Sequence, residues 1–312
     1  MTRFLGIILI LVISVSCNNK PYKKNQNTYR TEYKKIVEDN YELNKPIKNA
    51  NAVLILFGNY AENAETIERE FNILKDAKNN DIAVLYLNFN QKFWLTENDK
   101  TELTELLKRI FKENKLQKNN IYIGGFSTGG NISLLLSNHL IKTKNEIEPK
   151  GVFIVDSPID LLAFYEKCER NIERNFSEIS VQEGTWITNL FNDSLGNPKN
   201  GITNFEKNSP FTSQTNFIEN IANLNNTKLR FYTEPDINYW KINRQFEPED
   251  LNSFSIEKLS TVLQNRFNNK KVELIKTENK GYRSNGERNP HSWSIVDKEN
   301  LIEWMLKDKK LK

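Results

Sequence analysis

The sequence predicts an α/β fold: a mostly parallel, doubly wound sheet with helices on both faces and an inserted cap segment. Three observations predict it. Short, continuous apolar runs recur along the chain, amphipathic helical segments separate them, and the alternation stops once for a long polar stretch. Continuous apolar runs are typical of strands buried on both faces, and strand–helix alternation favours parallel crossovers.

The first part of the alternation precedes the long polar stretch. Apolar runs predict strands at four places: 52–57, 82–89, 120–125 and 150–156. Helical periodicity predicts helices at three places between them: 64–78, 102–116 and 129–141. In each of the first two helices the apolar residues fall near one face, which indicates a helix that packs against a sheet.

The second part follows the polar stretch at 159–226. A segment of that length without a strand is not expected to be bare loop in a compact domain, so we interpret it as an inserted, partly helical cap. The strand signal then returns, and the chain closes with four elements: strands at 228–233 and 272–277 and helices at 256–267 and 294–307.

The N-terminal region has a different character. A basic start and the apolar run 4–15 precede Cys17, after which the chain becomes polar. The run is short for a membrane span and has the anatomy of an export signal. A small residue before a cysteine resembles a bacterial lipoprotein signal, which implies lipidation of Cys17 and anchoring in the cell envelope, although the aliphatic residue usual three positions earlier is Ser14 here. An ordinary signal peptide or an uncleaved anchor is the alternative.

We therefore expect three regions. Residues 1–17 form the signal peptide, 18–47 form a polar tether that leads into one edge strand at most, and 48–312 form the folded domain. The only cysteine besides Cys17 is Cys168, so an intramolecular disulfide is not expected if Cys17 carries lipid.

Composition excludes some classes of function. The formal net charge is only +4, and Lys and acidic residues alternate instead of clustering. That pattern is typical of a solvated surface, so we expect no nucleic-acid partner. No spacing of Cys and His is typical of a metal site, and we expect neither a metal nor another cofactor.

Ser127 lies in the segment "GGFSTGG", which fits G-x-S-x-G between a predicted buried strand and a predicted helix. In that setting the serine sits on a sharp turn, and the residues two before and two after it must be small so that strand and helix can approach. The helix N-terminus also directs free N–H groups towards the serine oxygen. The motif predicts a nucleophile.

With this motif and this order of strands and helices, residues 50–312 resemble the α/β-hydrolase superfamily. The resemblance implies a triad in the order Ser, acid, His. His291, between the last strand and the last helix, is the expected base, whereas His139 lies on the helix after the serine. Asp236, on the loop after strand 228–233, is the favoured acid.

Other acids stay open at this point. Glu234 and Asp250 are the alternatives to Asp236. Asp156 either lies near the rim of the pocket or, in the favoured interpretation, is a cap or turn residue. The acid would hold the tautomer of the histidine and stabilise its cation.

An oxyanion hole needs two converging backbone N–H groups. Thr128, which follows the serine, is expected to supply one. Asn59 or Tyr60, after the turn at Gly58, is expected to supply the other, although the His-Gly pattern common in lipases and esterases of the superfamily is absent there.

Large aromatic residues lie on segments beside the predicted triad. We expect them to line a partly apolar substrate cleft: Tyr239, Trp240, Trp186 and Trp293. The alternative is that these aromatic side chains are buried in the hydrophobic core.

The resemblance to the superfamily implies a serine hydrolase that cleaves an ester of a small-molecule or carbohydrate-linked acyl substrate. The N-terminal segment adds export and membrane contact through the lipidated N-terminus only, and we expect a monomer. Two alternatives are a serine peptidase of the same fold and a non-catalytic cell-envelope protein that uses the cleft for binding.

Overall fold

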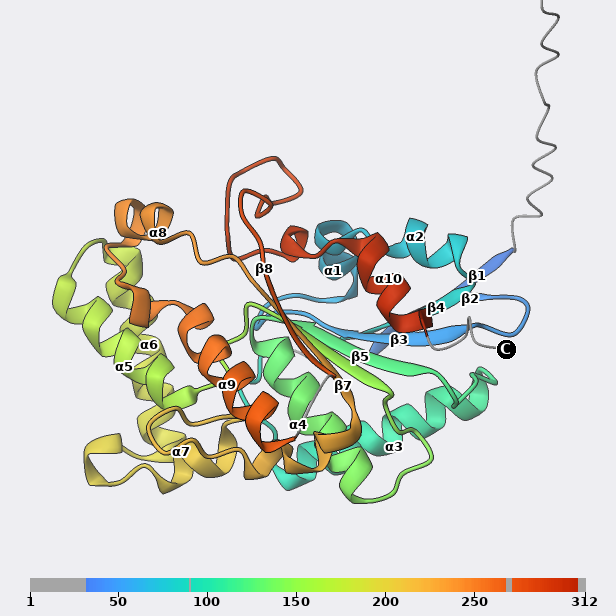
Figure 1. The fold of residues 1–312 in the computed structure, drawn as a ribbon, viewed down its shortest axis with the longest axis horizontal. Helices are drawn as coiled ribbons and strands as arrows, with labels where there is room; N and C mark the ends of the chain where they lie inside the picture. The colour runs from blue at the N-terminus through green and yellow to red at the C-terminus, as the bar shows by residue number, and fades with distance from the viewer. Residues whose placement is uncertain (1–31, 90, 268–270, 308–312) are drawn as a thin grey trace, which may run out of the picture. The chain divides into compact units, whose positions relative to one another are not determined.

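The structure is a computed structural model that describes residues 32–89, 91–267 and 271–307. Within these residues one sheet has the strand order β1-β2-β4-β3-β5-β6-β7-β8 (Figure 1). Its strands are β1 (Tyr33–Glu38), β2 (Tyr41–Pro46), β3 (Ala52–Phe57), β4 (Ile82–Leu87), β5 (Ile121–Phe126), β6 (Gly151–Val155), β7 (Lys228–Thr233) and β8 (Val272–Lys276). β3 to β8 are parallel, whereas β2 pairs antiparallel with β1 and β4.

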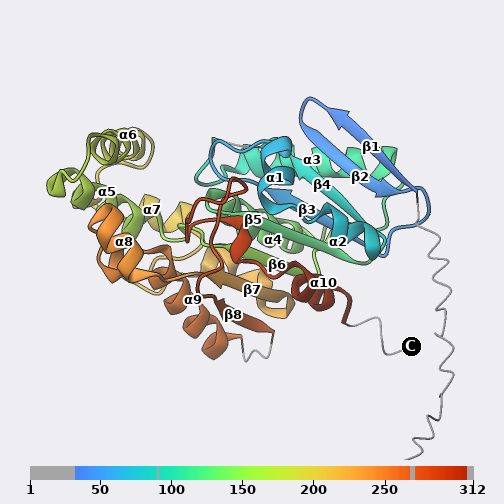
Figure 2. The same ribbon diagram turned by 90° about the horizontal axis from the view of Figure 1, so that it is seen from above.

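Helices cover both faces of the sheet (Figures 1 and 2). One face carries α1 (Ala64–Phe71), α2 (Leu74–Asn79) and α10 (Lys298–Leu306). The other carries α3 (Glu97–Glu113), α4 (Thr128–Lys142) and α9 (Asn252–Arg266). β3 shows how the core divides: Leu54 packs on the first face and Val53 on the second. The predicted α/β class is confirmed.

The continuous apolar runs were the most reliable guide to the sheet. β3 and β7 have the predicted bounds, and every residue of β3 is buried. A strand covered by helices on both faces needs apolar side chains at successive positions, which is the pattern that the sequence displays.

The predicted tether contains two strands. β1 and β2 form an antiparallel hairpin that extends the sheet beyond β4. Most side chains of β1 are exposed, and β2 mixes polar residues with the buried Tyr41 and Leu43. An edge hairpin does not need a continuous apolar run, and the sequence therefore gave only a weak strand signal here. The folded domain includes residues well before position 48.

Two helical predictions also needed correction. The predicted helix at 64–78 is two helices, because Asn72 adopts a left-handed conformation (φ 47°) and its N–H donates to Glu68 O, which ends α1. A further helix, α8 (Ile237–Arg244), follows β7 in a segment that was predicted to be a loop. Its N-terminus is capped by Asp236.

The segment between β6 and β7 contains three α-helices, α5 (Leu161–Arg174), α6 (Glu178–Leu195) and α7 (Thr203–Asn208), and two 3-10 helices at Pro198–Asn200 and Glu219–Asn226. Two segments that follow β7 pack against these helices: α8 and residues 246–251. Arg244 of α8 donates to Ser180 Oγ at 3.0 Å, and Asp250 forms ion pairs with Arg170 and Arg174 of α5 at 2.8 and 2.6 Å. We call α5–α8 and residues 246–251 the cap.

Among the described helices, none is both long and apolar enough to cross a membrane. The predicted signal peptide, Cys17 and the tether as far as residue 31 lie outside the described residues.

Candidate active site

Ser127 occupies the sharp turn between β5 and α4. Its backbone has φ 53° and ψ −126°, a conformation that non-glycine residues rarely adopt. The Ser127 N–H donates to Val155 O of the neighbouring strand at 2.9 Å, which secures the turn against the sheet. The strain and this anchor together hold the side chain at the carboxyl edge of the sheet.

The glycines around Ser127 are sterically required. A Cβ added at Gly125 would lie 2.1 Å from Gly129 O, and one added at Gly129 would lie 2.4 Å from Phe57 O. Strand, turn and helix therefore approach one another as the G-x-S-x-G motif predicts. The adjacent Gly130 meets the same limit, because its Cβ would lie 1.9 Å from Ser157 Oγ.

His291 and Asp156 continue a chain of polar contacts from Ser127. His291 Nε2 lies 3.1 Å from Ser127 Oγ, and His291 Nδ1 lies 2.6 Å from Asp156 Oδ2. The ring of His291 also packs on Phe126, with ring centroids 4.5 Å apart. The structure brings together the predicted nucleophile and base, but it supplies a different acid.

Asp156 is well placed to orient the histidine. It follows β6 directly, at the edge of the sheet where the parallel strands end, and has φ 43°. Its Oδ1 accepts a hydrogen bond from Thr233 Oγ1 at 3.1 Å, and its carbonyl accepts one from Asn252 at 2.8 Å. With Oδ1 occupied by Thr233, Oδ2 faces His291 in a fixed orientation.

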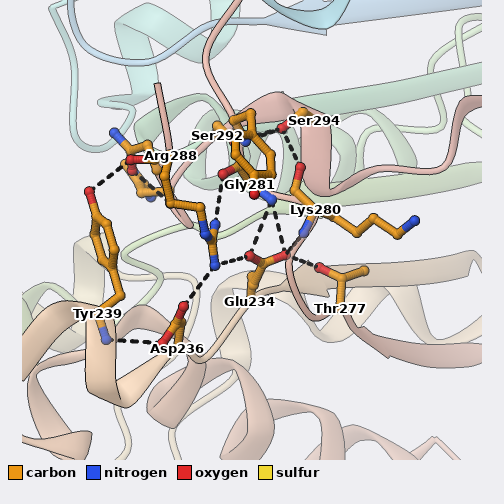
Figure 3. A network of polar contacts seen from close by, with 12 residues as sticks. Glu234, Asp236, Tyr239, Thr277, Lys280, Gly281, Arg288, Ser292 and Ser294 are labelled. Atoms are coloured by element: carbon orange, nitrogen blue, oxygen red, sulfur yellow. Dashed lines mark hydrogen bonds and ion pairs between the residues drawn. The ribbon is translucent and has the colours of Figure 1, made fainter. Parts of the chain in front are cut away.

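The prediction that Asp236 orients His291 was wrong. Asp236 accepts from the N–H of Tyr239 at 3.0 Å, which caps α8, and pairs with Arg288 at 2.7 Å (Figure 3). The alternatives are also engaged elsewhere: Asp250 pairs with arginines of α5, and Glu234 binds the loop after β8. The interpretation of Asp156 as a cap or turn residue missed its contact with the histidine.

Glu234 anchors the loop that carries His291 (Figure 3). Its carboxylate accepts from the backbone N–H groups of Lys280 and Gly281, at 2.9 and 3.1 Å. It also accepts from Thr277 Oγ1 at 2.9 Å and pairs with Arg288 at 2.6 Å. Because both ends of the loop are fixed to one buried side chain, the position of His291 depends on β7 as well as on its own segment.

Glu62 connects the turn after β3 to the same loop. Glu62 Oε2 accepts from Asn59 N at 3.0 Å and from Trp293 Nε1 at 3.1 Å. Burial raises the pKa of the Glu62 carboxyl, although these two hydrogen bonds oppose the shift. Sequence reasoning missed this residue because its role depends on a contact 231 positions away.

The predicted oxyanion donors lie around Ser127. Thr128 and Tyr60 line the same cavity as Ser127, and neither backbone N–H donates to another described residue. Asn59 also lines the cavity, but its N–H is already donated to Glu62. Of the two candidates after Gly58, the geometry favours Tyr60.

A cavity of about 410 Å³ opens between the cap and the cluster of Ser127, His291 and Asp156. Trp186 and Trp240 line it, as predicted, whereas Tyr239 and Trp293 do not. Tyr239 points its hydroxyl to Arg288 O at 2.9 Å. Trp293 is 1% exposed and stacks on Phe71 with ring centroids 4.5 Å apart, so it belongs to the core.

Further aromatic side chains complete one wall of the cavity. Tyr60 packs against Phe93 and Trp186, with ring centroids 4.9 and 5.2 Å apart.

The described residues contain no group of three or more His, Cys, Asp or Glu side chains arranged to hold a metal ion.

Comparisons with known proteins place the fold. No protein-family model and no curated protein matches the sequence. Solved structures do match. A carboxyl esterase from the fungus Tuber melanosporum has a TM-score of 0.54 at 15% identity, covering 93% of this chain and 89% of that one.

Two further esterases agree with it. One from Rhizomucor miehei has a TM-score of 0.52 at 15% identity, covering 90% of this chain and 83% of that one. One from Pyrococcus furiosus has a TM-score of 0.51 at 14% identity, with coverage of 89% and 91%. At such identities the likeness shows the fold alone: the chain has the α/β-hydrolase fold.

Proposed function

We propose that this chain is a serine hydrolase that cleaves esters through a Ser127–His291–Asp156 triad. One observation carries the proposal: the Oγ of a serine on a strained strand-to-helix turn lies 3.1 Å from His291 Nε2, and Nδ1 of that ring lies 2.6 Å from a carboxylate. A nucleophile, a base and an orienting group in contact are the minimum set for acyl transfer by serine.

The mechanism follows from the contacts. His291 Nε2 accepts the Ser127 hydroxyl proton as Oγ attacks the ester carbonyl carbon. The same nitrogen then returns the proton to the departing alkoxide, which leaves an acyl-serine. Water then attacks the acyl-serine with His291 again as the base. The bond between the acyl carbon and Ser127 Oγ breaks, His291 returns the proton to Oγ, and the acid leaves. Asp156 holds Nδ1 protonated throughout, so that Nε2 carries the free electron pair.

The negative charge that develops on the carbonyl oxygen when Ser127 attacks needs hydrogen-bond donors to stabilise it. The backbone N–H groups of Thr128 and Tyr60 fill this role in the proposal. The N-terminus of α4 adds its positive dipole end next to Ser127. Glu62 acts indirectly, because it fixes the turn that presents Tyr60 through its bond to Asn59.

Labelling with a fluorophosphonate probe tests the proposal. We expect the wild-type protein to become labelled and the Ser127→Ala protein to remain unlabelled, because the probe modifies only a serine activated by a base. A folded wild-type protein that never labels would contradict the proposal and favour a non-catalytic cleft, the alternative from another class. The short Ser127–His291 distance argues against that alternative.

Ester and amide substrates separate the esterase from the peptidase of the same fold. We expect 4-nitrophenyl esters of graded chain length to be hydrolysed and aminoacyl anilides to be left intact. Turnover of the anilides at a comparable kcat/KM would instead assign the triad to a peptidase.

We also propose, from the N-terminal sequence, that the protein is exported and lipid-anchored through Cys17. Growth of a bacterial expression host with a radiolabelled fatty acid tests this. Incorporation into the wild-type chain and its loss in Cys17→Ser are expected, and equal labelling of both chains would overturn it.

A further inference from the structure

One cation at the wall of the cavity above Ser127 lies beside aromatic rings and forms no ion pair with a described carboxylate. Lys167, on α5 of the cap, lines the cavity, and no carboxylate among the described residues lies within 4.0 Å of its ammonium group. Instead, Nζ lies 4.6 Å from the ring centroid of Phe246 and 5.6 Å from that of Phe164. The side chain is half-buried between these two rings. Cation–π contacts compensate only part of the loss of water.

Three of the four carboxylates that line the cavity are already bound by other groups. Asp250 also lines the cavity, but Arg170 and Arg174 bind it. Glu234 is bound by Arg288 and by backbone N–H groups, and Asp156 is bound by His291. None of these carboxylates is available to Lys167.

The other cations of the cavity have partners or neighbours of opposite charge. Arg244 donates to Ser180 Oγ and lies 3.9 Å from Glu183. Arg283 lies near the buried carboxylate of Glu62 and lowers its pKa. Lys167 differs from both arginines because aromatic rings, and not a carboxylate, lie beside its ammonium group at the wall of the cavity.

We propose that Lys167 is a specificity-determining residue that binds a carboxylate, or a similar monoanionic group, of the ester substrate. This inference rests on the proposed function. The aromatic wall of Tyr60, Phe93 and Trp186 binds the planar or apolar body of the substrate, and the Lys167 ammonium binds its anionic end. A charge-assisted hydrogen bond in such a partly desolvated place is stronger than one between neutral groups.

Paired esters that differ only in charge test the proposal. In the acyl arm, mono(4-nitrophenyl) terephthalate is compared with its methyl ester. In the alcohol arm, 4-butyryloxybenzoate is compared with its methyl ester. We expect the wild-type kcat/KM to favour the anionic member of at least one pair, and the arm that shows the preference locates the anion on the acyl or the alcohol side.

Substitutions assign the preference to one side chain. Lys167→Met is expected to lower kcat/KM for the preferred anion about 10-fold, the scale of a charged hydrogen bond, and to leave the neutral ester unchanged. Lys167→Arg is expected to retain the preference. Lys258→Met is the matched control, because Lys258 also lies over an aromatic ring, Phe254, at 4.3 Å, but does not line the cavity.

A binding measurement separates this inference from the proposed function. In a Ser127→Ala background, calorimetry with the intact anionic and neutral esters needs no turnover. Weaker binding of the anion alone after Lys167→Met supports the inference even if no ester is hydrolysed. An equal loss of affinity for both members of a pair, or no loss for either, overturns the inference. Hydrolysis of neutral esters without a preference for the anionic ester also overturns the inference, but it leaves the proposed function standing.

Discussion

Two aspartates follow parallel strands at the same edge of the sheet, but only Asp156 contacts His291, with Oδ2 2.6 Å from Nδ1. Asp156 and Asp236 both follow parallel strands, and parallel strands end at the same edge of a sheet. Sequence position alone therefore could not choose between them. The choice depends on which carboxylate contacts His291, and Asp236 is held away by its cap on α8 and its pair with Arg288. Ser127 and His291 were predictable, because a local motif and a local context mark each.

Replacing each aspartate by asparagine distinguishes their roles. We expect Asp156→Asn to lower kcat about 10³–10⁴-fold, because an amide at this position favours the wrong tautomer of the histidine. Asp236→Asn keeps the shape of the α8 cap and is expected to change kcat by less than about 3-fold, since Arg288 retains Glu234. Steady-state hydrolysis of one ester measures both, and a larger effect at Asp236 would reverse the assignment.

Glu62 gives a prediction about pH. Burial raises the pKa of its carboxyl above the ordinary value of 4.5, so the folded chain holds this proton more tightly than the unfolded chain. The stability that Glu62 contributes is complete below pH 4.5 and is lost as the pH rises through the folded pKa. We expect Glu62→Gln, which does not titrate, to gain stability relative to wild type as the pH rises, by at most about 1.4 kcal/mol per pH unit.

Glu70 is the matched control for this prediction because its shift has the opposite sign. Burial raises the pKa of the Glu70 carboxyl, but hydrogen bonds from Ser284 outweigh that effect and leave the pKa lowered. Its contribution is present above its unfolded pKa and lost as the pH falls through its folded pKa. Glu70→Gln should therefore lose stability relative to wild type as the pH rises. Urea denaturation between pH 2.5 and 8 measures both, with the Glu70 trend expected below its unfolded pKa of 4.5 and the Glu62 trend above it. Parallel trends in the two variants would contradict the prediction.

At the scale of elements, the sequence predicted the strands whose burial requires apolar residues. It missed a helix and a helix end that depend on local contacts and backbone conformation. β3 was predicted with its full bounds, because a strand that helices cover on both faces demands an unbroken apolar run. α8 was missed because none of its residues is buried, and so it has no apolar stripe facing the core. The break between α1 and α2 depends on a single left-handed residue, Asn72, which hydrophobic periodicity does not register.

The loop between β8 and α10 carries the proposed base, and Glu234 is the side chain that secures it. We expect Glu234→Gln to destabilise the fold by about 3 kcal/mol, because it breaks a buried ion pair and removes an acceptor from the loop N–H groups. We also expect kcat to fall more than KM rises, since His291 loses its fixed position.

The rate of phosphonate labelling at 10 °C separates positioning from unfolding, because the variant is still folded at that temperature. Slower labelling by Glu234→Gln with an unchanged circular dichroism spectrum supports a positioning role. Asp236→Asn, which alters the same Arg288 pair without touching the loop backbone, is the control and should label at the wild-type rate. Wild-type labelling by Glu234→Gln would show that the anchor serves stability alone.

At the scale of the whole molecule, the boundary of the domain was the largest error of the sequence reading. The polar composition of residues 18–47 predicted that they lie outside the domain. In the structure, however, β2 pairs with β4 over four positions, Tyr41 to Asn44. Leu43 is fully buried in the same core cluster as α3 and α4. An edge hairpin draws its stability from one neighbouring strand and one covered face, so its sequence can be mostly polar and still belong to the fold.

Two truncations test where the domain begins. A chain that starts at residue 32 keeps the hairpin, and we expect it to unfold at the same temperature as the full chain. A chain that starts at residue 48 loses β1 and β2, exposes the backbone edge of β4 and uncovers the apolar surface under Leu43. Open strand edges next to apolar surface pair with other chains, so we expect this shorter chain to melt at a lower temperature and to elute as aggregates in size-exclusion chromatography. If it melted like the longer one and eluted as a monomer, the hairpin would be an appendage, and the boundary predicted at residue 48 would hold.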